Sequence, residues 1–275
     1  MHSPAFTRGL SQVKRFFIRL PDGQSFAGVS LQQNSEFLLE DAERLHYLKT
    51  VLRLKGGEPV ILVNEEKPES VLATVTRLER RSAVFSITQP LPAVADGLPD
   101  VVLACALIKE HRWEWLIQKT VELGVRRIQP LLTERCVIQL KLAEYARKQV
   151  RWQAIARAAA EQSEGLFIPA ILLPSSLSGY LSNLDAVADR FLLQERGEAR
   201  LPFAEAVQSC LQAARSVRTL HLALGPEGGW TDAEICQFKE AGFMGTSLGG
   251  RVLRAETAAM TAMGTIVALS DAGPS

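Results

Sequence analysis

The sequence lacks a surplus of charge, a cysteine motif and a long apolar run. Its 31 Lys and Arg residues face 30 Asp and Glu residues, for a net charge of +1, so the charge balance alone does not indicate a nucleic-acid partner. The four cysteines lie far apart and the four histidines have no metal-ligand spacing, which argues against a zinc site or a redox pair. We therefore expect no metal ion.

No apolar run approaches the roughly 18 residues that a membrane-spanning helix requires. The first 17 residues also lack the apolar core of a secretory signal. From these absences we expect a cytoplasmic protein without a membrane partner. A chain of 275 residues is long for one compact core and sufficient for two domains.

Residues 1–90 are the first predicted domain. They contain short apolar runs separated by turn residues, which is typical of β-strands. One helix is expected over residues 41–51, where Leu45 and Leu48 are three positions apart. Many short strands with one helix favour a small β-barrel. The predicted strands are residues 16–20, 59–63, 71–75 and 83–88.

Residues 91–100 are the predicted linker, because this part of the chain is rich in proline. The pattern then changes to that of an α/β domain over residues 101–275. Strands with intervening amphipathic helices indicate a parallel sheet that helices cover on both sides. The predicted strands are residues 101–108, 128–132, 191–194, 220–224 and 244–248, and a long helix is expected over residues 141–163.

Two glycine turns near the C-terminus are the most informative feature. Residues 225–229 follow one predicted strand, and Gly249 and Gly250 follow the next. Ligands of open α/β sheets bind at the carboxyl ends of strands, and glycine lets the backbone approach them closely. Glycine turns after two strands that we take to be adjacent therefore predict a ligand site.

The helices after these turns also have clear signals. Thr231 and Glu234 fit a capping box, Gly242 can end that helix, and a helix of small residues begins at Glu256. Neither turn is a P-loop or a dinucleotide fingerprint, and Glu227 would repel a phosphate. The first loop therefore suits a ligand with hydroxyls or a positive charge, such as S-adenosylmethionine. The alternative is two tight turns without a ligand.

At these residues the sequence resembles the ribosomal RNA small subunit methyltransferase E family of the SPOUT superfamily. LGPEGGWTDAEI and SLGGRVLRAETAAM match its two C-terminal motifs. KRFFI and HYLKTVLRLKGGEPV resemble its N-terminal PUA-like domain. WEWLIQKTVELGVRRIQPLLTERCV and RWQAIARAAAEQS resemble its central motifs. The matches run nearly end to end and in order.

The resemblance implies methyl transfer from S-adenosylmethionine to N3 of one uridine in the 16S rRNA of the small ribosomal subunit. It also implies an N-terminal PUA-like β-barrel, a SPOUT α/β domain with a deep trefoil knot, and a homodimer. Two alternatives stay open. One is a SPOUT methyltransferase that acts on another RNA, such as tRNA, and the other is an RNA-binding assembly factor without catalysis.

The sequence departs from the family pattern at a few positions. After residues 161–163 the family usually continues with Gly-Arg and a further basic residue, whereas this chain has Glu164 and Gly165 and then apolar residues. Trp230 and Ala255 stand where the family usually has Phe and Thr. Both glycine turns are intact, so the departures affect the expected RNA contacts more than the expected cofactor site.

The expected site residues follow from the turns and the resemblance. Arg254 is the predicted catalytic residue, because a guanidinium near O2 or O4 of uracil stabilises the charge that develops as N3 loses its proton. The alternative for Arg254 is an ion pair with Glu227 or Glu256, and no residue stands out as a general base. The helix from Glu256 to Leu269 is the expected dimer interface. The expected cofactor-binding residues are Leu224, Gly225, Pro226, Glu227, Gly228, Leu248, Gly249, Arg251, Val252, Leu253, Arg254 and Thr257. The expected RNA-binding residues are Arg15, His46, Arg53, Lys109, Arg112 and Arg135.

Overall fold

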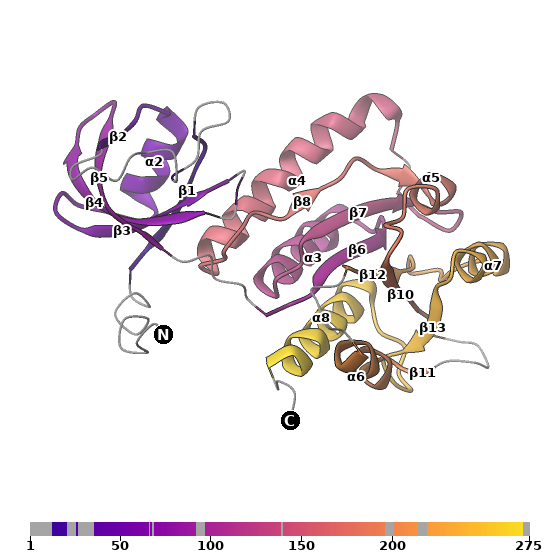
Figure 1. The fold of residues 1–275 in the computed structure, drawn as a ribbon. Coiled ribbons are helices and arrows are strands. Elements are labelled where there is room, and N and C mark those ends of the chain that lie inside the picture. Colours follow the sequence, from indigo (N-terminus) through magenta and orange to yellow (C-terminus); the bar gives the residue numbers. More distant parts are fainter. Residues whose placement is uncertain are drawn as a thin grey trace. The chain divides into compact units, whose positions relative to one another are not determined.

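The computed structural model describes residues 13–20, 26, 36–65, 67, 69–91, 97–138, 140–195, 201–213 and 219–271. The chain divides into two compact units, Met1–Val94 and Ala95–Ser275, and each contains one sheet (Figure 1). The division falls inside the predicted linker. Regular structure reaches further into that segment than expected, because one strand ends at Leu91 and the next begins at Asp100.

The first unit is a five-stranded sheet with the order β1-β3-β4-β5-β2. The four predicted strands are confirmed, and β2 is an additional short strand that pairs with β5. Phe16, Leu48 and Phe85 are fully buried in its core. The strand order has β1 and β2 at its two ends, so closure into a PUA-like barrel stays a prediction. The strands are β1 Arg15–Ile18, β2 Glu36–Leu39, β3 Pro59–Asn64, β4 Ser70–Leu78 and β5 Ala83–Leu91.

The predicted helix of the first unit is α2, Ala42–Thr50. It begins at Asp41, whose carboxylate accepts a hydrogen bond from the backbone N–H of Arg44 at 2.9 Å, as an N-cap residue does. The Arg44 guanidinium lies 4.6 Å from the ring centre of Phe16 in β1. A cation–π contact thus joins the first turn of the helix to the sheet.

The second unit is an eight-stranded sheet whose strand pairs are all parallel, which confirms the predicted α/β fold. The order is β11-β13-β10-β12-β6-β7-β8, and β9 also pairs with β7. The strands are β6 Asp100–Ala106, β7 Arg127–Leu132, β8 Ala170–Ile171, β9 Ser175–Ser176, β10 Ala188–Leu193, β11 Leu201–Pro202, β12 Thr219–Leu224 and β13 Met244–Ser247.

The strands that precede the two glycine turns are not neighbours, so the expectation of adjacent strands was wrong. Strand β10 lies between them: Phe191 is in register with Leu222 of β12 on one side and with Met244 of β13 on the other. Strand β10 comes before β12 and β13 in the sequence, and these two later strands pair with its two edges. Local patterning does not show such an order.

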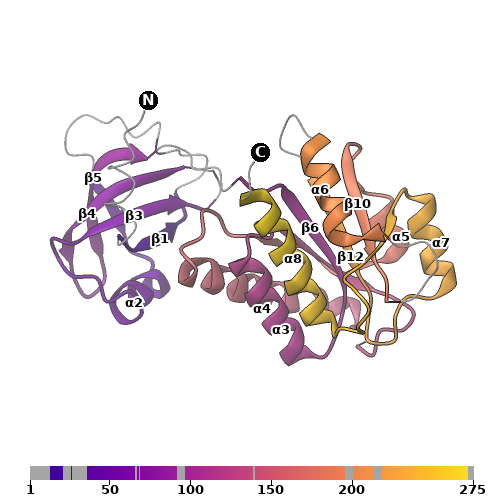
Figure 2. The ribbon, with the colours of Figure 1, turned by 90° about the horizontal axis from the view of Figure 1, so that it is seen from below.

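Helices cover both faces of this sheet. Helices α5 and α7 pack on one face, over a cluster that includes Ala104, Leu192 and Ala223. Helix α8 lies between α3 and α6 and contacts both (Figure 2), while α4 packs on α3 through Trp113 and Trp152 at 5.5 Å between ring centres. The helices are α3 Glu110–Glu122, α4 Leu142–Gln162, α5 Leu177–Leu181, α6 Phe203–Ala213, α7 Asp232–Glu240 and α8 Ala255–Asp271.

The predicted helix ends are confirmed. Gly124 and Gly242, which follow α3 and α7, have φ angles of +82° and +81°, in the left-handed region that glycine adopts at helix ends. Thr231 and Glu234 form the predicted capping box. In the part of the chain that the structure describes, no helix is both long and apolar enough to cross a bilayer.

Candidate active site

A cavity of about 740 Å³ lies at the carboxyl ends of β10, β12 and β13. Residues 193–195 after β10, residues 224–230 after β12 and residues 251–255 after β13 line it, and α7 contributes a further wall. The carboxyl ends of parallel strands meet at one edge of a sheet, where open α/β folds bind ligands. The two glycine turns of the sequence therefore line one cavity.

The expected cofactor-binding residues lie at this cavity, with one exception. All five of the first turn line it, and so do Leu248, Gly249 and residues 251–254 of the second turn. Thr257 is absent from the lining, whereas Ala258 is present. Helix α8 begins at Ala255, and successive helical residues are turned by about 100° from one another, so Ala255 and Ala258 share the face that borders the cavity.

Residues 193–195 are a part of the site that sequence reasoning missed. A strand over residues 191–194 was expected, but the signal that would have added its end to the site is the strand order, with β10 between β12 and β13. Trp230 joins this segment to the first glycine turn, because its indole N–H donates a hydrogen bond to the carbonyl of Leu193 at 3.3 Å.

The first glycine turn is held by a side chain from the loop after β7. The Arg135 guanidinium donates hydrogen bonds to the carbonyls of Gly228 at 3.0 Å and Trp230 at 3.2 Å. A Cβ atom on Gly228 would lie only 3.2 Å from the Cβ of Arg135. Arg135, an expected RNA contact, is therefore engaged in bracing the turn.

The second turn differs in its backbone. Gly249 has a φ of +114° and open space where a Cβ would stand, so strain rather than collision restricts this position to glycine. The Ser247 hydroxyl accepts a hydrogen bond from the backbone N–H of Gly249 at 3.2 Å. Val252 is 67% exposed, which leaves the middle of this turn open to a ligand or a partner.

An arginine from α3 links the two turns. Nη1 of Arg112 lies 2.8 Å from Oε1 of Glu227 in the first turn, and its Nε lies 3.8 Å from Oε1 of Glu256, just after the second turn. Glu256 is buried, and its Oε2 has no hydrogen-bond partner among the described residues. The ion pairs that were the alternative for Arg254 are thus made by Arg112.

Arg254 itself is exposed and lines the cavity. Within the described ranges it forms no hydrogen bond or ion pair through its side chain, in contrast to Arg112 and Arg135. Its guanidinium is therefore available to a ligand in the cavity, as the predicted catalytic role requires.

Comparison with known proteins identifies the family. Residues 96–267 match the model of the RNA methyltransferase domain family. Ribosomal RNA small subunit methyltransferase E of Synechocystis sp. is 35% identical over 232 residues, which cover 83% of this chain and 72% of the relative. The chain belongs to the ribosomal RNA small subunit methyltransferase E family. The Bacillus subtilis member is 27% identical over 262 residues, or 92% of this chain and 96% of the relative.

Solved structures of this family and its relatives have the same fold. A ribosomal RNA small subunit methyltransferase E from Neisseria gonorrhoeae, bound to S-adenosylmethionine, has a TM-score of 0.76 at 27% identity and covers 94% of this chain and 98% of its own. A Legionella pneumophila methyltransferase in complex with the same cofactor has a TM-score of 0.75 at 28% identity, with the same coverage.

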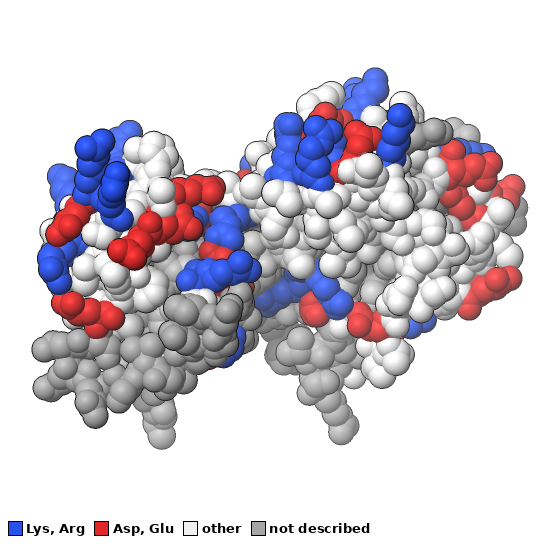
Figure 3. All heavy atoms as spheres, turned by 90° about the horizontal axis from the view of Figure 1, so that it is seen from above, with Lys and Arg blue, Asp and Glu red and all other residues white. Residues whose placement is uncertain are grey.

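Three of the four remaining residues that we expected to contact RNA are exposed. His46 and Arg53 of the first unit and Lys109 of the second are exposed, and Arg15 is half-buried. On the face drawn in Figure 3, basic side chains are interspersed with acidic ones. Those of α4 are largely paired: Arg147 with Glu144, Lys148 with Glu110 and Arg151 with Glu114.

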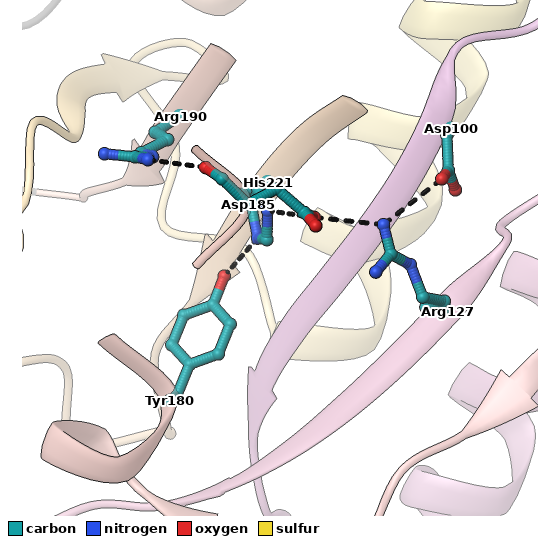
Figure 4. A network of polar contacts seen from close by, with 6 residues as sticks. All are labelled: Asp100, Arg127, Tyr180, Asp185, Arg190 and His221. Atoms are coloured by element: carbon teal, nitrogen blue, oxygen red, sulfur yellow. Dashed lines mark hydrogen bonds and ion pairs between the residues drawn. The ribbon is translucent and has the colours of Figure 1, made fainter. Parts of the chain in front are cut away.

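A second polar cluster lies at the amino ends of the strands, away from the cavity (Figure 4). Asp185 is 3.0 Å from Nε2 of His221 and 3.1 Å from Nη2 of Arg127, and the Tyr180 hydroxyl is 2.8 Å from Nδ1 of His221. Arg127 also reaches Asp100 at 3.1 Å. The cluster joins β6, β7 and β12 to the segment before β10.

The environment of this cluster shifts its pKa values. Burial, together with the charges of Arg127 and Arg190, lowers the pKa of His221 more than Asp185 raises it. Burial raises the pKa of Asp185, but Arg127 and His221 outweigh it and leave that pKa below its usual value. Burial also raises the pKa of Tyr180. None of these residues lines the cavity, so the cluster braces the sheet rather than taking part in the reaction.

Among the described residues of both units, no three His, Cys, Asp or Glu side chains are arranged so that they could hold a metal ion.

Proposed function

We propose that this protein transfers a methyl group from S-adenosylmethionine to N3 of a uridine in the 16S rRNA of the small ribosomal subunit. Membership of the family supports the reaction, and the cofactor in the Neisseria gonorrhoeae relative supports the methyl donor. The single observation that carries the proposal is that both glycine turns line one cavity at the carboxyl edge of the parallel sheet.

The residues at the cavity fit this cofactor. At Gly249 nothing lies within 4 Å of the place where a Cβ atom would stand, so its backbone is accessible to a ligand in the cavity, whereas Gly225 and Gly228 leave room for the side chains of Trp230 and Arg135 that hold the first turn. The cavity wall also carries the carboxylate of Glu227, which is paired with Arg112 and can accept hydrogen bonds from ribose hydroxyls. Bound S-adenosylmethionine supplies a methyl group that its sulfonium has already activated.

The protein must then position the uridine and stabilise its N3 anion. Holding two reactants in line contributes up to roughly 7–11 kcal/mol in favourable cases. Arg254, unpaired and at the cavity, is positioned to donate hydrogen bonds to a uracil carbonyl, and its planar fork gives two donors in fixed geometry. The charge that Arg254 would meet develops only as N3 loses its proton, so this interaction accelerates the reaction rather than strengthening ground-state binding.

The first unit is proposed to be a PUA-like domain that binds the RNA. Arg15, His46 and Arg53 are the proposed contacts there, and Lys109 is the proposed contact at the start of α3. Phosphate contacts of this kind position an RNA without reading its sequence. The RNA substrate implies that the protein works in the cytoplasm.

We further propose that the second unit contains the trefoil knot of the SPOUT superfamily and forms a homodimer through α8. Met263 and Ile266 of this helix are buried within their own unit, so intramolecular packing accounts for part of its apolar face. Met260 and Val267 are only half-buried, and Thr261 is exposed. This second face of small and apolar residues is the proposed interface.

Methylation mapping tests the function. A strain without the gene should lose 3-methyluridine at one position of 16S rRNA and regain it when the gene is restored. Loss of a methyl group from tRNA instead would show the first alternative, another RNA target. Absence of S-adenosylmethionine binding in calorimetry, with rRNA binding retained, would show the second, an assembly factor without catalysis.

A further inference from the structure

The cavity continues along α7, beyond the two glycine turns. Asp232, Ile235 and Lys239 all line it, and their spacing of three and four residues places them on one face of the helix. Seven helical residues span about 10 Å. Lys239 is in the last turn of α7. It therefore lines the cavity about 10 Å along the helix from Asp232, which lies at the helix start next to the first glycine turn.

Three cations at the cavity have no partner within the described parts of the chain. Lys239 from α7 and Arg251 and Arg254 from the second turn line it and are exposed, and their side chains make no hydrogen bond or ion pair there. By contrast, Arg112 and Arg135 are engaged by the first turn. Although Asp232 and Glu227 also line the cavity, its wall carries these exposed cations from two separate elements, and each of them can attract an anion.

The methyl donor does not account for all three cations, because it carries a single carboxylate. An RNA substrate carries one phosphate per nucleotide and extends beyond the reacting base on both sides. We infer that Lys239 binds a backbone phosphate of the RNA next to the nucleotide that enters the cavity. The inference rests on the proposed function, and it adds an RNA contact on α7, outside both motifs that resemble the cofactor loops.

Lysine suits this role. Its ammonium is a compact charge on a flexible stem, so it follows a phosphate without imposing the fixed geometry of a guanidinium. A contact to phosphate orients the RNA and carries no sequence information. Lys239 is therefore expected to affect RNA affinity equally for target and non-target sequences, whereas Arg254 is expected to affect turnover.

The salt dependence of RNA binding tests the inference. Each lost phosphate contact makes the slope of log affinity against log salt less steep by about 0.7–0.9. Lys239→Gln should show this change on a small-subunit rRNA fragment, and Lys239→Arg should keep the wild-type slope. The matched control is Lys119→Gln, which removes the same charge from α3, where Lys119 is paired with Glu122 at 2.8 Å; its slope should not change.

Calorimetry with S-adenosylmethionine on the same samples separates the outcomes. Unchanged cofactor affinity in Lys239→Gln, together with the reduced slope, supports the phosphate contact. A wild-type slope in Lys239→Gln overturns it, and so does a loss of cofactor affinity without a change in slope, which would assign Lys239 to the cofactor carboxylate. If the wild-type protein itself fails to bind the cofactor, the proposed function fails independently of the salt slopes.

Discussion

The indole ring of Trp230 packs directly against the backbone of Gly225. A Cβ atom on Gly225 would lie 3.2 Å from both Nε1 and Cε2 of that ring, closer than the roughly 3.5–4.0 Å of an optimal contact between heavy atoms. The ring is also held by the hydrogen bond from its Nε1 to the carbonyl of Leu193. The first glycine turn and the end of β10 therefore depend on the same side chain.

Replacement of Gly225 by valine should weaken S-adenosylmethionine binding at least tenfold, or about 1.4 kcal/mol, because Trp230 must move and disturb two walls of the cavity. Calorimetry measures the affinity. The control is Gly250→Val in the other turn, where nothing lies within 4 Å of an added Cβ and where we expect a change of less than twofold. Equal affinities of the two variants would contradict the prediction.

The ion pair between Arg112 and Glu227 should support cofactor binding by coupling α3 to the first turn. Both side chains are about one quarter exposed, so we expect a coupling energy of about 0.5–1 kcal/mol. A double-mutant cycle of Arg112→Gln and Glu227→Gln, measured on S-adenosylmethionine affinity, gives this value. If Arg112 instead serves only as an RNA contact, its variant will lower RNA affinity and leave cofactor affinity unchanged.

Arg254→Ala should lower kcat about 100-fold, the usual effect of removing one donor from a developing anion, with little change in cofactor affinity. Arg254→Lys should remain impaired, because an ammonium does not reproduce the planar fork. Methyl transfer to small-subunit RNA and calorimetry on the same samples measure both quantities. Normal turnover in Arg254→Lys would reject the catalytic role.

Glu164→Gly should stabilise the protein. Glu164 follows the end of α4 with a φ of +55°, a left-handed conformation that costs a residue with a Cβ about 1–2 kcal/mol. Glycine removes that strain but adds freedom to the unfolded chain, so we expect a net gain of about 0.5–1 kcal/mol. Thermal unfolding measures it. Ser163→Gly, one position earlier with a φ of −86°, should destabilise instead.

The stability of the protein should fall as the pH drops below about 6.5, because burial lowers the pKa of His221 from 6.5. The unfolded chain then binds a proton that the folded chain does not, which favours unfolding until the pH lies below the folded pKa as well. The slope is at most about 1.4 kcal/mol per pH unit. Denaturant unfolding between pH 5 and 8 measures it (roughly the range in which histidine titrates). The slope should diminish in His221→Gln and persist in His111→Gln, an exposed control.

Features with a local signal were predictable from the sequence. The helix start at Thr231 depends on contacts over three residues, and the glycine after α7 depends on one backbone angle. Features formed by distant residues were not predictable in this way. Arg112 and Glu227 are 115 positions apart, and no periodicity relates an arginine at the start of one helix to a glutamate in a later turn.

The strand order had the same limitation. Strands β12 and β13 are each identifiable from composition and from the turns that follow them. Their separation by β10 depends instead on pairing between distant segments, since Phe191 and its partner Met244 are more than 50 residues apart. Glu234 illustrates how a local motif gains a distant role, because its Oε1 also accepts the backbone N–H of Glu134 at 3.0 Å. The capping box thus also fixes the loop that carries Arg135.

The central place of β10 has a consequence for biosynthesis. Apart from Arg135, every residue at the cavity is Leu193 or follows it, so a ribosome must translate most of the chain before a cofactor site exists. Until β12 and β13 are made, both edges of β10 lack the strands that later pair with them, and unpaired strand edges promote aggregation.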